Sequence, residues 1–155
     1  MTAPPARHPL DIGSDGRMDA LSQRTFLLLI VSQALHSIEE YHYALWEVLA
    51  PARFLSGLVS SDLSLGFAVI NTAIVAFGVW TYLVPVRQNR SYAPQIAWFW
   101  IILEFANGIG HIVFAVSSQG YFPGVYTAPL LLVFSSYLAM QLMRGGHVPD
   151  GKHHH

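Results

Sequence analysis

The sequence predicts an all-α membrane protein in which four transmembrane helices form a bundle. Two observations concern composition: 53% of the 155 residues are hydrophobic and only 11% are charged. In a typical soluble domain about a quarter of the residues are charged. The third observation is a series of long apolar runs, because about 20 apolar residues are enough for a helix to cross a bilayer.

The apolar runs are bounded by residues that start or stop helices. Ser22 is suited to the N-cap of the first run. Pro51 and Pro85 should end the first and second runs, because a proline ring clashes with a continuing helix. Pro94 fits the first turn of the third run. The expected membrane domain covers residues 22–144, with spans at about 22–49, 63–84, 94–117 and 127–143.

The remaining segments are expected to be tails and loops. Residues 1–21 should form a flexible N-terminal tail, and residues 145–155 a C-terminal tail. The three histidines that end the chain resemble a purification tag, so they take no part in any metal argument. Residues 51–62 predict a short interfacial segment between the first and second spans.

The basic residues predict that both termini are cytoplasmic, since cytoplasmic loops carry an excess of Lys and Arg. With that orientation seven of the eight basic residues lie inside, and only Arg53 lies outside. The expected location is therefore the plasma membrane. The net charge of −1 provides no basic surface for nucleic acid, and the absence of cysteine excludes disulfides and thiolate ligands.

Polar residues interrupt the first predicted span where a membrane helix normally carries leucine. His36, Glu39, Glu40 and Tyr43 follow the i, i+3, i+4, i+7 spacing and therefore share one helix face. A charged acid at the centre of a membrane helix costs about 2.5–3.5 kcal/mol, so such residues usually carry a function. Glu47, at i+11, shares this face near the outer end of the span, and three roles stay open for it: a solvated residue, a partner of Arg53 or a member of the site.

The third predicted span carries a second polar face. Glu104, Asn107 and His111 are spaced i, i+3, i+7. At a rise of 1.5 Å per residue, Glu39 and His111 lie about 22 and 25 Å from the inner ends of their helices, which are similar depths. All four glutamates belong to these two spans. The pattern predicts one shared polar site between the first and third spans.

The residue types at this site favour a divalent metal ion. Imidazole and carboxylate ligands suit zinc, iron or manganese. Glu40 and Glu104 are also candidates for a bridging ligand or a general base. Asn107 and Tyr43 are expected to form hydrogen bonds to the ligands without binding the metal themselves. The expected ligands are His36, Glu39, Glu40 and His111.

These residues predict a metal-dependent membrane enzyme. An activated water or oxygen would act on a lipid-like or otherwise apolar substrate that enters from the bilayer. These residues are compatible with both hydrolysis and oxidation.

The same residues also support functions without a metal. A neutral glutamic acid and a nearby base could isomerise a double bond or cyclise a polyprenyl- or sterol-like substrate. Intramembrane Glu and His also suit a proton relay in a channel or transporter, although four spans are few and a homo-oligomer would be needed. A hydrogen-bond network that only fixes helix packing is the structural alternative. His42 points away from the polar face and receives no role.

Three short patterns resemble the motifs of the HXXEE family, a group of small, mostly prokaryotic proteins with several predicted membrane spans. They are His36-x-x-Glu39-Glu40, Asn107-x-x-x-His111 and Tyr121-x-Pro123-Gly124, in the expected order. The resemblance implies a prokaryotic integral membrane enzyme and supplies no substrate. It adds Tyr121, Pro123 and Gly124 to the site.

The residues of the third motif predict a turn at the outer side of the membrane. Pro-Gly is typical of a type II turn, in which glycine takes a positive φ. One interpretation is a lid that places Tyr121 over the site as a further catalytic residue. A purely structural turn is the other.

Overall fold

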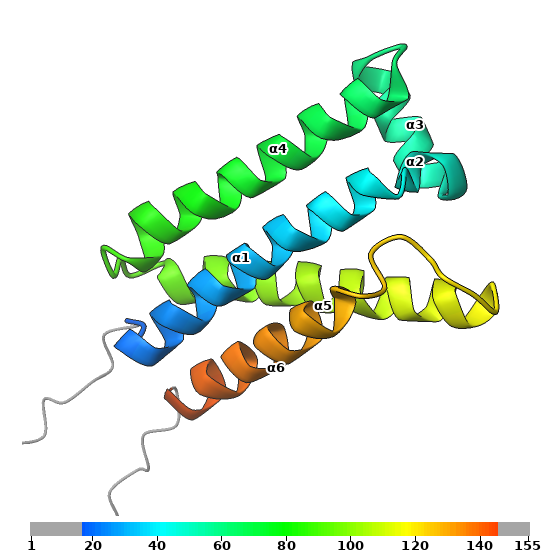
Figure 1. Ribbon diagram of the computed structural model, residues 1–155. Coiled ribbons are helices and arrows are strands. Elements are labelled where there is room, and N and C mark those ends of the chain that lie inside the picture. The colour runs from blue at the N-terminus through cyan, green and yellow to red at the C-terminus, as the bar shows by residue number, and fades with distance from the viewer. Residues whose placement is uncertain (1–16, 146–155) are drawn as a thin grey trace, which may run out of the picture.

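The computed structural model describes residues 17–145, and every regular element in this range is helical (Figure 1). Most of the expected tails lie outside the described residues, although α1 already begins at Ala20. The elements are α1 (Ala20–His42), α2 (Leu45–Val48), α3 (Ala50–Val59), α4 (Leu63–Thr81), the π-helix η1 (Tyr82–Val86), α5 (Ala93–Ser117) and α6 (Ala128–Gly145).

Two of these helices are long and apolar enough to cross a membrane: Leu63–Val86, which joins α4 to η1, and Ala93–Ser117, which is α5. Helix α6 is apolar but shorter, over Ala128–Arg144. Helix α1 is also long, but polar side chains interrupt its apolar sequence. The all-helical class is therefore confirmed, with two candidate membrane-spanning helices and a third, shorter apolar helix.

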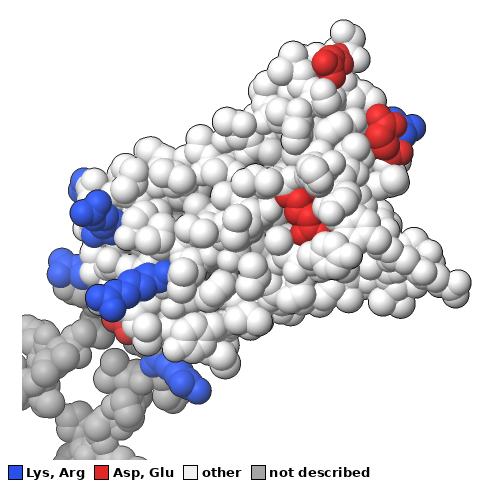
Figure 2. All heavy atoms as spheres, viewed as in Figure 1, with Lys and Arg blue, Asp and Glu red and all other residues white. Residues whose placement is uncertain are grey.

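The long helices lie side by side, with α1 packed against α4 and α6, and α6 packed against α5 (Figure 1). The start of α1, the turn between η1 and α5 and the end of α6 lie at the same end of the molecule. Arginines gather at this end, while most of the rest of the face shown in Figure 2 is uncharged. Arg53 lies on α3, at the opposite end.

Several helix boundaries differ from those expected. Asp19 caps α1 in place of Ser22, because its Oδ1 accepts a hydrogen bond from the Ser22 N–H at 2.7 Å. Helix α1 ends at His42, earlier than residue 49, because Ala44 adopts a left-handed conformation with φ 51°.

The two prolines that were expected to end helices do not do so. Pro51 lies in the first turn of α3, where its missing N–H costs nothing. Pro85 lies inside η1, which continues α4 as a π-helix. The i→i−4 hydrogen bonds of an α-helix, which proline cannot donate, are replaced there by i→i−5 hydrogen bonds. The expected interfacial segment is thus a helix, α3, whose Phe54 and Leu58 are 65% and 68% exposed.

Buried apolar side chains form two clusters, one on each side of the polar region of α1. The cluster at the arginine-rich end includes Phe26, Leu29 and Trp100, and the indole N–H of Trp100 donates to Thr81 Oγ1 at 3.4 Å. The second cluster consists of Leu45, Trp46, Phe67 and Phe122. The residues between the two clusters along α1 are those of the predicted polar site.

Gly66 allows a close contact between α3 and α4. A Cβ atom at this position would overlap the Ser56 carbonyl, so we expect Gly66→Ala to push the two helices apart and to destabilise the protein by about 1–3 kcal/mol. Thermal unfolding in detergent would measure the loss. Gly110→Ala is the matched control, because no described atom lies within 4 Å of that Cβ. An equal melting temperature for the two variants would contradict the contact.

Candidate metal centre

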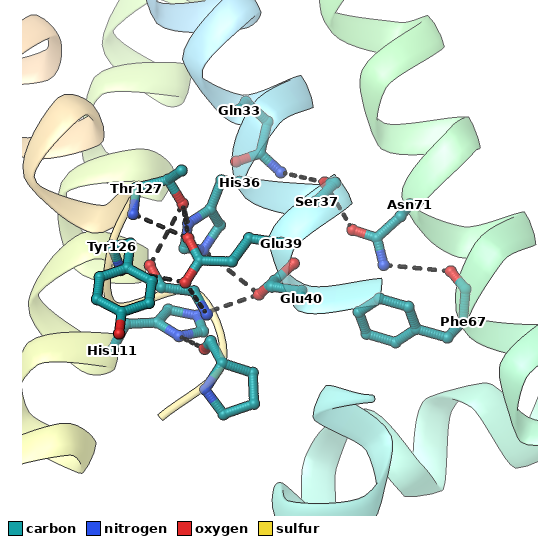
Figure 3. Close-up of polar contacts among 12 residues, drawn as sticks. Gln33, His36, Ser37, Glu39, Glu40, Phe67, Asn71, His111, Tyr126 and Thr127 are labelled. Atoms are coloured by element: carbon teal, nitrogen blue, oxygen red, sulfur yellow. Dashed lines mark hydrogen bonds and ion pairs between the residues drawn. The ribbon is translucent and has the colours of Figure 1, made fainter. Parts of the chain in front are cut away.

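Helices α1 and α5 bring His36, Glu40 and His111 together (Figure 3). His36 and Glu40 are one turn apart on α1, and His111 approaches from α5. The Nε2 atoms of His111 and His36 lie 3.1 Å and 3.4 Å from Glu40 Oε1. All three side chains are buried, and one potential ligand atom from each lies within 4.8 Å of the other two.

Hydrogen bonding fixes which nitrogen of His111 carries hydrogen. His111 Nδ1 lies 2.6 Å from the carbonyl oxygen of Pro123, which can only accept a hydrogen bond. Nδ1 is therefore protonated and donates to Pro123. In a neutral imidazole this leaves the lone pair on Nε2, which faces Glu40.

The same argument applies to His36 through Thr127. His36 Nδ1 lies 2.8 Å from Thr127 Oγ1. Two other neighbours of that hydroxyl are acceptors, Glu39 Oε2 at 2.6 Å and the Gly124 carbonyl at 3.3 Å, so its one hydrogen is used there. Thr127 must then accept from His36 Nδ1–H. The Nε2 lone pair of His36 is buried and has no hydrogen-bond partner among the described residues.

With neutral imidazoles the cluster presents electron pairs to one another, and either a metal ion or a proton between them would remove this repulsion. Neighbouring atoms bound to one metal at about 2.0–2.2 Å in octahedral or tetrahedral geometry lie roughly 2.8–3.6 Å apart. The separations of 3.1 and 3.4 Å fit this range. Metal-binding histidines usually donate their other ring N–H to a carbonyl or a carboxylate-linked group, as His111 and His36 do here. The three buried side chains could thus hold a metal ion.

Glu39, which was expected among the ligands, faces the loop before α6. Its carboxylate accepts hydrogen bonds from backbone and side-chain donors of that loop. The donors are Tyr121 Oη at 2.9 Å, the N–H groups of Gly124 and Tyr126 at 3.1 Å, and the N–H and Oγ1 of Thr127 at 2.9 and 2.6 Å. Because α6 begins at Ala128, this negative charge also lies near a helix N-terminus, where it is favourable. The structure places Glu39 as the anchor of the loop.

The loop covers both histidine rings at Gly124. This residue has φ +94°, and an added Cβ would lie 2.6 Å from His111 Nδ1 and 2.7 Å from His36 Cε1. Glycine is therefore required by conformation and by space. Tyr121 contacts Glu39 and not the cluster. Burial and the Glu39 carboxylate raise the pKa of Tyr121 above its ordinary value, which keeps its hydroxyl a donor.

The other expected site residues lie around the cluster. Glu104 is buried, and the two ends of the Gln33 side-chain amide lie 2.6 Å from its Oε2 and 3.2 Å from Ser37 Oγ. Asn107 lines a cavity together with Glu40 and Glu104. Tyr43 packs its ring 4.7 Å from that of Tyr121, outside the cluster.

Sequence reasoning did not find Thr127 or the polar chain beside Glu104. In that chain Ser37 Oγ donates to Asn71 Oδ1 at 2.8 Å, and Asn71 Nδ2 donates to the Phe67 carbonyl at 3.2 Å (Figure 3). A threonine directly before a helix is a capping signal. That signal predicts a local hydrogen bond, whereas the Thr127 hydroxyl bonds to α1, 88 residues earlier.

The anchoring role of Glu39 can be tested by Glu39→Gln. An amide can present only one oxygen, so some loop donors would face an NH₂ group, and we expect a loss of about 1–3 kcal/mol in unfolding free energy. Metal affinity should also fall by about 10–100-fold, because Thr127 would no longer be held against His36. Thermal unfolding and metal titration measure both effects.

Glu47→Gln is the control for charge alone. Glu47 is exposed and lies 3.6 Å from Arg53, so its substitution should change stability by no more than about 0.5 kcal/mol. If Glu39→Gln were as mild as Glu47→Gln, the loop would not depend on this carboxylate.

The fold and the site define an all-helical protein with membrane-length apolar helices and a buried His–Glu–His cluster. The chain belongs to the HXXEE family: a family model described as a protein of unknown function with HXXEE motif matches residues 27–139. No curated protein and no solved structure matches the chain. The matched range contains the three motifs, and the resemblance to this family is therefore confirmed.

Proposed function

We propose that this protein is a metal-dependent integral membrane enzyme in which His36, Glu40 and His111 hold a divalent zinc, iron or manganese ion. The observation that carries the proposal is the convergence of two histidine Nε2 atoms on one carboxylate oxygen, with both Nδ1 atoms engaged elsewhere. Three protein ligands leave a coordination position open, as in catalytic sites. A bound metal would supply Lewis acidity and activate water or oxygen there.

We also propose that all four long helices cross the plasma membrane. The apolar side of α1 carries Leu28, Val31, Leu35 and Ile38, which are all at least 47% exposed and therefore available to lipid. Its polar side packs inside the protein, as membrane helices with ionisable residues require. The arginine-rich end would be cytoplasmic, together with both termini.

The proposed substrate is apolar and reaches the centre through a cavity beside it. This cavity has a volume of about 380 Å³ and is lined by Glu40, Glu104 and many apolar side chains. Glu104 is the proposed proton donor or acceptor, because it is buried, lines the same cavity as Glu40 and is not needed as a ligand. Zinc would favour hydrolysis, and iron or manganese would favour oxidation.

Elemental analysis of detergent-purified protein without His153–His155 tests the proposal. We expect about one equivalent of a divalent metal, and X-ray absorption should show nitrogen and oxygen neighbours at about 2.0–2.2 Å. Protein that binds no metal even after reconstitution with zinc, iron and manganese would overturn it.

A metal-free acid–base enzyme is the second candidate, favoured by one distance. The 3.1 Å between His111 Nε2 and Glu40 Oε1 also suits a hydrogen bond with a proton between the two atoms. Such a pair, with Glu104, would catalyse isomerisation or cyclisation of an apolar substrate. Activity that survives complete chelation would support this function over the metal-dependent one.

A further inference from the structure

The cavity beside the cluster is bounded by four helices. Its walls come from α1, α3, α4 and α5, and its volume of about 380 Å³ lies in the range of small-molecule sites. Apolar side chains such as Phe67, Ile70 and Ile74 supply most of the wall. The polar side chains are few: Gln33, Glu40, Ser56, Asn71, Glu104 and Asn107.

Ser56 is the polar group in this wall that lacks a protein partner. It is fully buried, and its hydroxyl makes no hydrogen bond to any described residue. Asn71, by contrast, is bonded at both ends of its amide. A buried hydroxyl without a partner is unfavourable, and a hydroxyl or carbonyl group of a ligand would supply the missing hydrogen bond.

The charges around the cavity are unsuited to an anion. Its wall contains the carboxyl groups of Glu40 and Glu104 and no Lys, Arg or His. Arg53 on α3 bonds to the Trp46 and Glu47 carbonyls and is not part of the wall. A phosphate, sulfate or carboxylate headgroup would therefore be buried without a counter-charge, which is strongly unfavourable.

The mouth of the cavity is apolar. Leu55 on α3 and Leu103 on α5 both line the cavity and are 50% and 41% exposed, so they lie where it opens to the surroundings. A molecule that enters between these leucines comes from an apolar phase. The walls, charges and mouth together describe a ligand with an apolar body and a small neutral polar group.

We propose that this cavity binds an uncharged apolar alcohol, ketone or ester, and that it excludes anionic lipids. The inference rests on the proposed function, because the cavity reaches the metal centre through Glu40. It narrows the substrate to a molecule whose hydroxyl or carbonyl oxygen meets Ser56 or the open side of the centre.

Photoaffinity labelling of the protein in phosphatidylcholine nanodiscs tests the proposal. The probes are three 16-carbon chains that carry the same diazirine: an alcohol, an alkyl sulfate and an unsubstituted alkane. We expect the alcohol to label the peptides that contain Leu55 and Leu103 about tenfold more than the sulfate does, and excess hexadecanol to displace it. Equal labelling by alcohol and sulfate would overturn the proposal.

Two variants with one matched control locate the labelling. Ala52→Phe places a ring in this cavity and should abolish the specific labelling. Ala68→Phe places the same ring in a separate groove between α1 and α4, and should leave the labelling intact. Ser56→Ala removes only an unpartnered hydroxyl, so the fold is kept and the preference for alcohol over alkane should fall severalfold. If both Ala52→Phe and Ser56→Ala keep the parent's preference for the alcohol probe over the sulfate and alkane probes, the ligand binds elsewhere.

Metal content measured on the same samples separates this inference from the proposed function. Alcohol-specific labelling of protein that binds no metal would support the cavity assignment and overturn the metal proposal. Stoichiometric metal without alcohol-specific labelling would support the metal centre and overturn the cavity assignment.

Discussion

Loss of one histidine from the cluster is expected to abolish metal binding. In His111→Ala the ion would lose one of three ligands, and the Pro123 carbonyl would lose its donor, so affinity should fall by at least about 100-fold. His36→Ala should behave in the same way. Metal titration by calorimetry, on protein without the three terminal histidines, measures the change.

His42→Ala is the matched control, because His42 belongs to α1 but is exposed and outside the cluster. Its metal affinity should equal that of the parent protein. Parallel losses in His42→Ala and His111→Ala would mean that the bound metal is not at the proposed centre.

Glu40→Gln separates the metal from the packing of the cluster. A glutamine amide can donate hydrogen to the histidine lone pairs that the carboxylate oxygen faces, so the variant should stay folded while it loses the metal. Chelation should lower the melting temperature of the parent and leave that of Glu40→Gln unchanged. A variant that melts far below the chelated parent would indicate that the carboxylate itself holds the helices together.

The second large effect is expected at Gly124. Gly124→Ala combines an unfavourable positive φ with a methyl group that would lie within 2.7 Å of both histidine rings. We expect a loss of about 1–3 kcal/mol in stability from the backbone and overpacking, together with displacement of the rings and loss of the metal. Thermal unfolding and elemental analysis of the variant measure both.

Gly120→Ala provides the comparison in the same loop. The nearest atom to its Cβ would be a backbone oxygen at 3.8 Å, an ordinary contact. This variant should keep the metal and the stability of the parent. Retention of metal by Gly124→Ala would show that the loop does not hold the rings in place.

Helical periodicity was sufficient to predict which faces of α1 and α5 would meet. His36 and Glu40, spaced i, i+4, and His111 from the other helix do converge. Periodicity could not tell which of the two adjacent glutamates faces the histidines, because Glu39 and Glu40 point about 100° apart and both suit a polar face. Their roles depend on the loop before α6, whose donors lie 82 to 88 residues further along the chain.

Local patterns also failed where the backbone departs from common conformations. Ala44 ends α1 with a positive φ, which alanine rarely adopts, so no residue there signalled the break. Pro51 was a correct signal of a helix boundary, but it marks the start of α3 and not the end of α1. Composition was sufficient to predict long apolar helices at about 63–84 and 94–117, where the structure has the candidate membrane helices Leu63–Val86 and Ala93–Ser117.

The anchoring of Glu39 by the segment before α6 has a consequence for biosynthesis. His36 is synthesised long before Thr127, which lies 91 residues later in the chain. Until the segment before α6 has been synthesised and packed against α1, Glu39 lacks its donors and the Nδ1 atoms of both histidines lack their acceptors. The orientation of the imidazoles is then unrestrained. Loading of the proposed metal centre would therefore follow completion of the chain, and truncated products would not hold the metal.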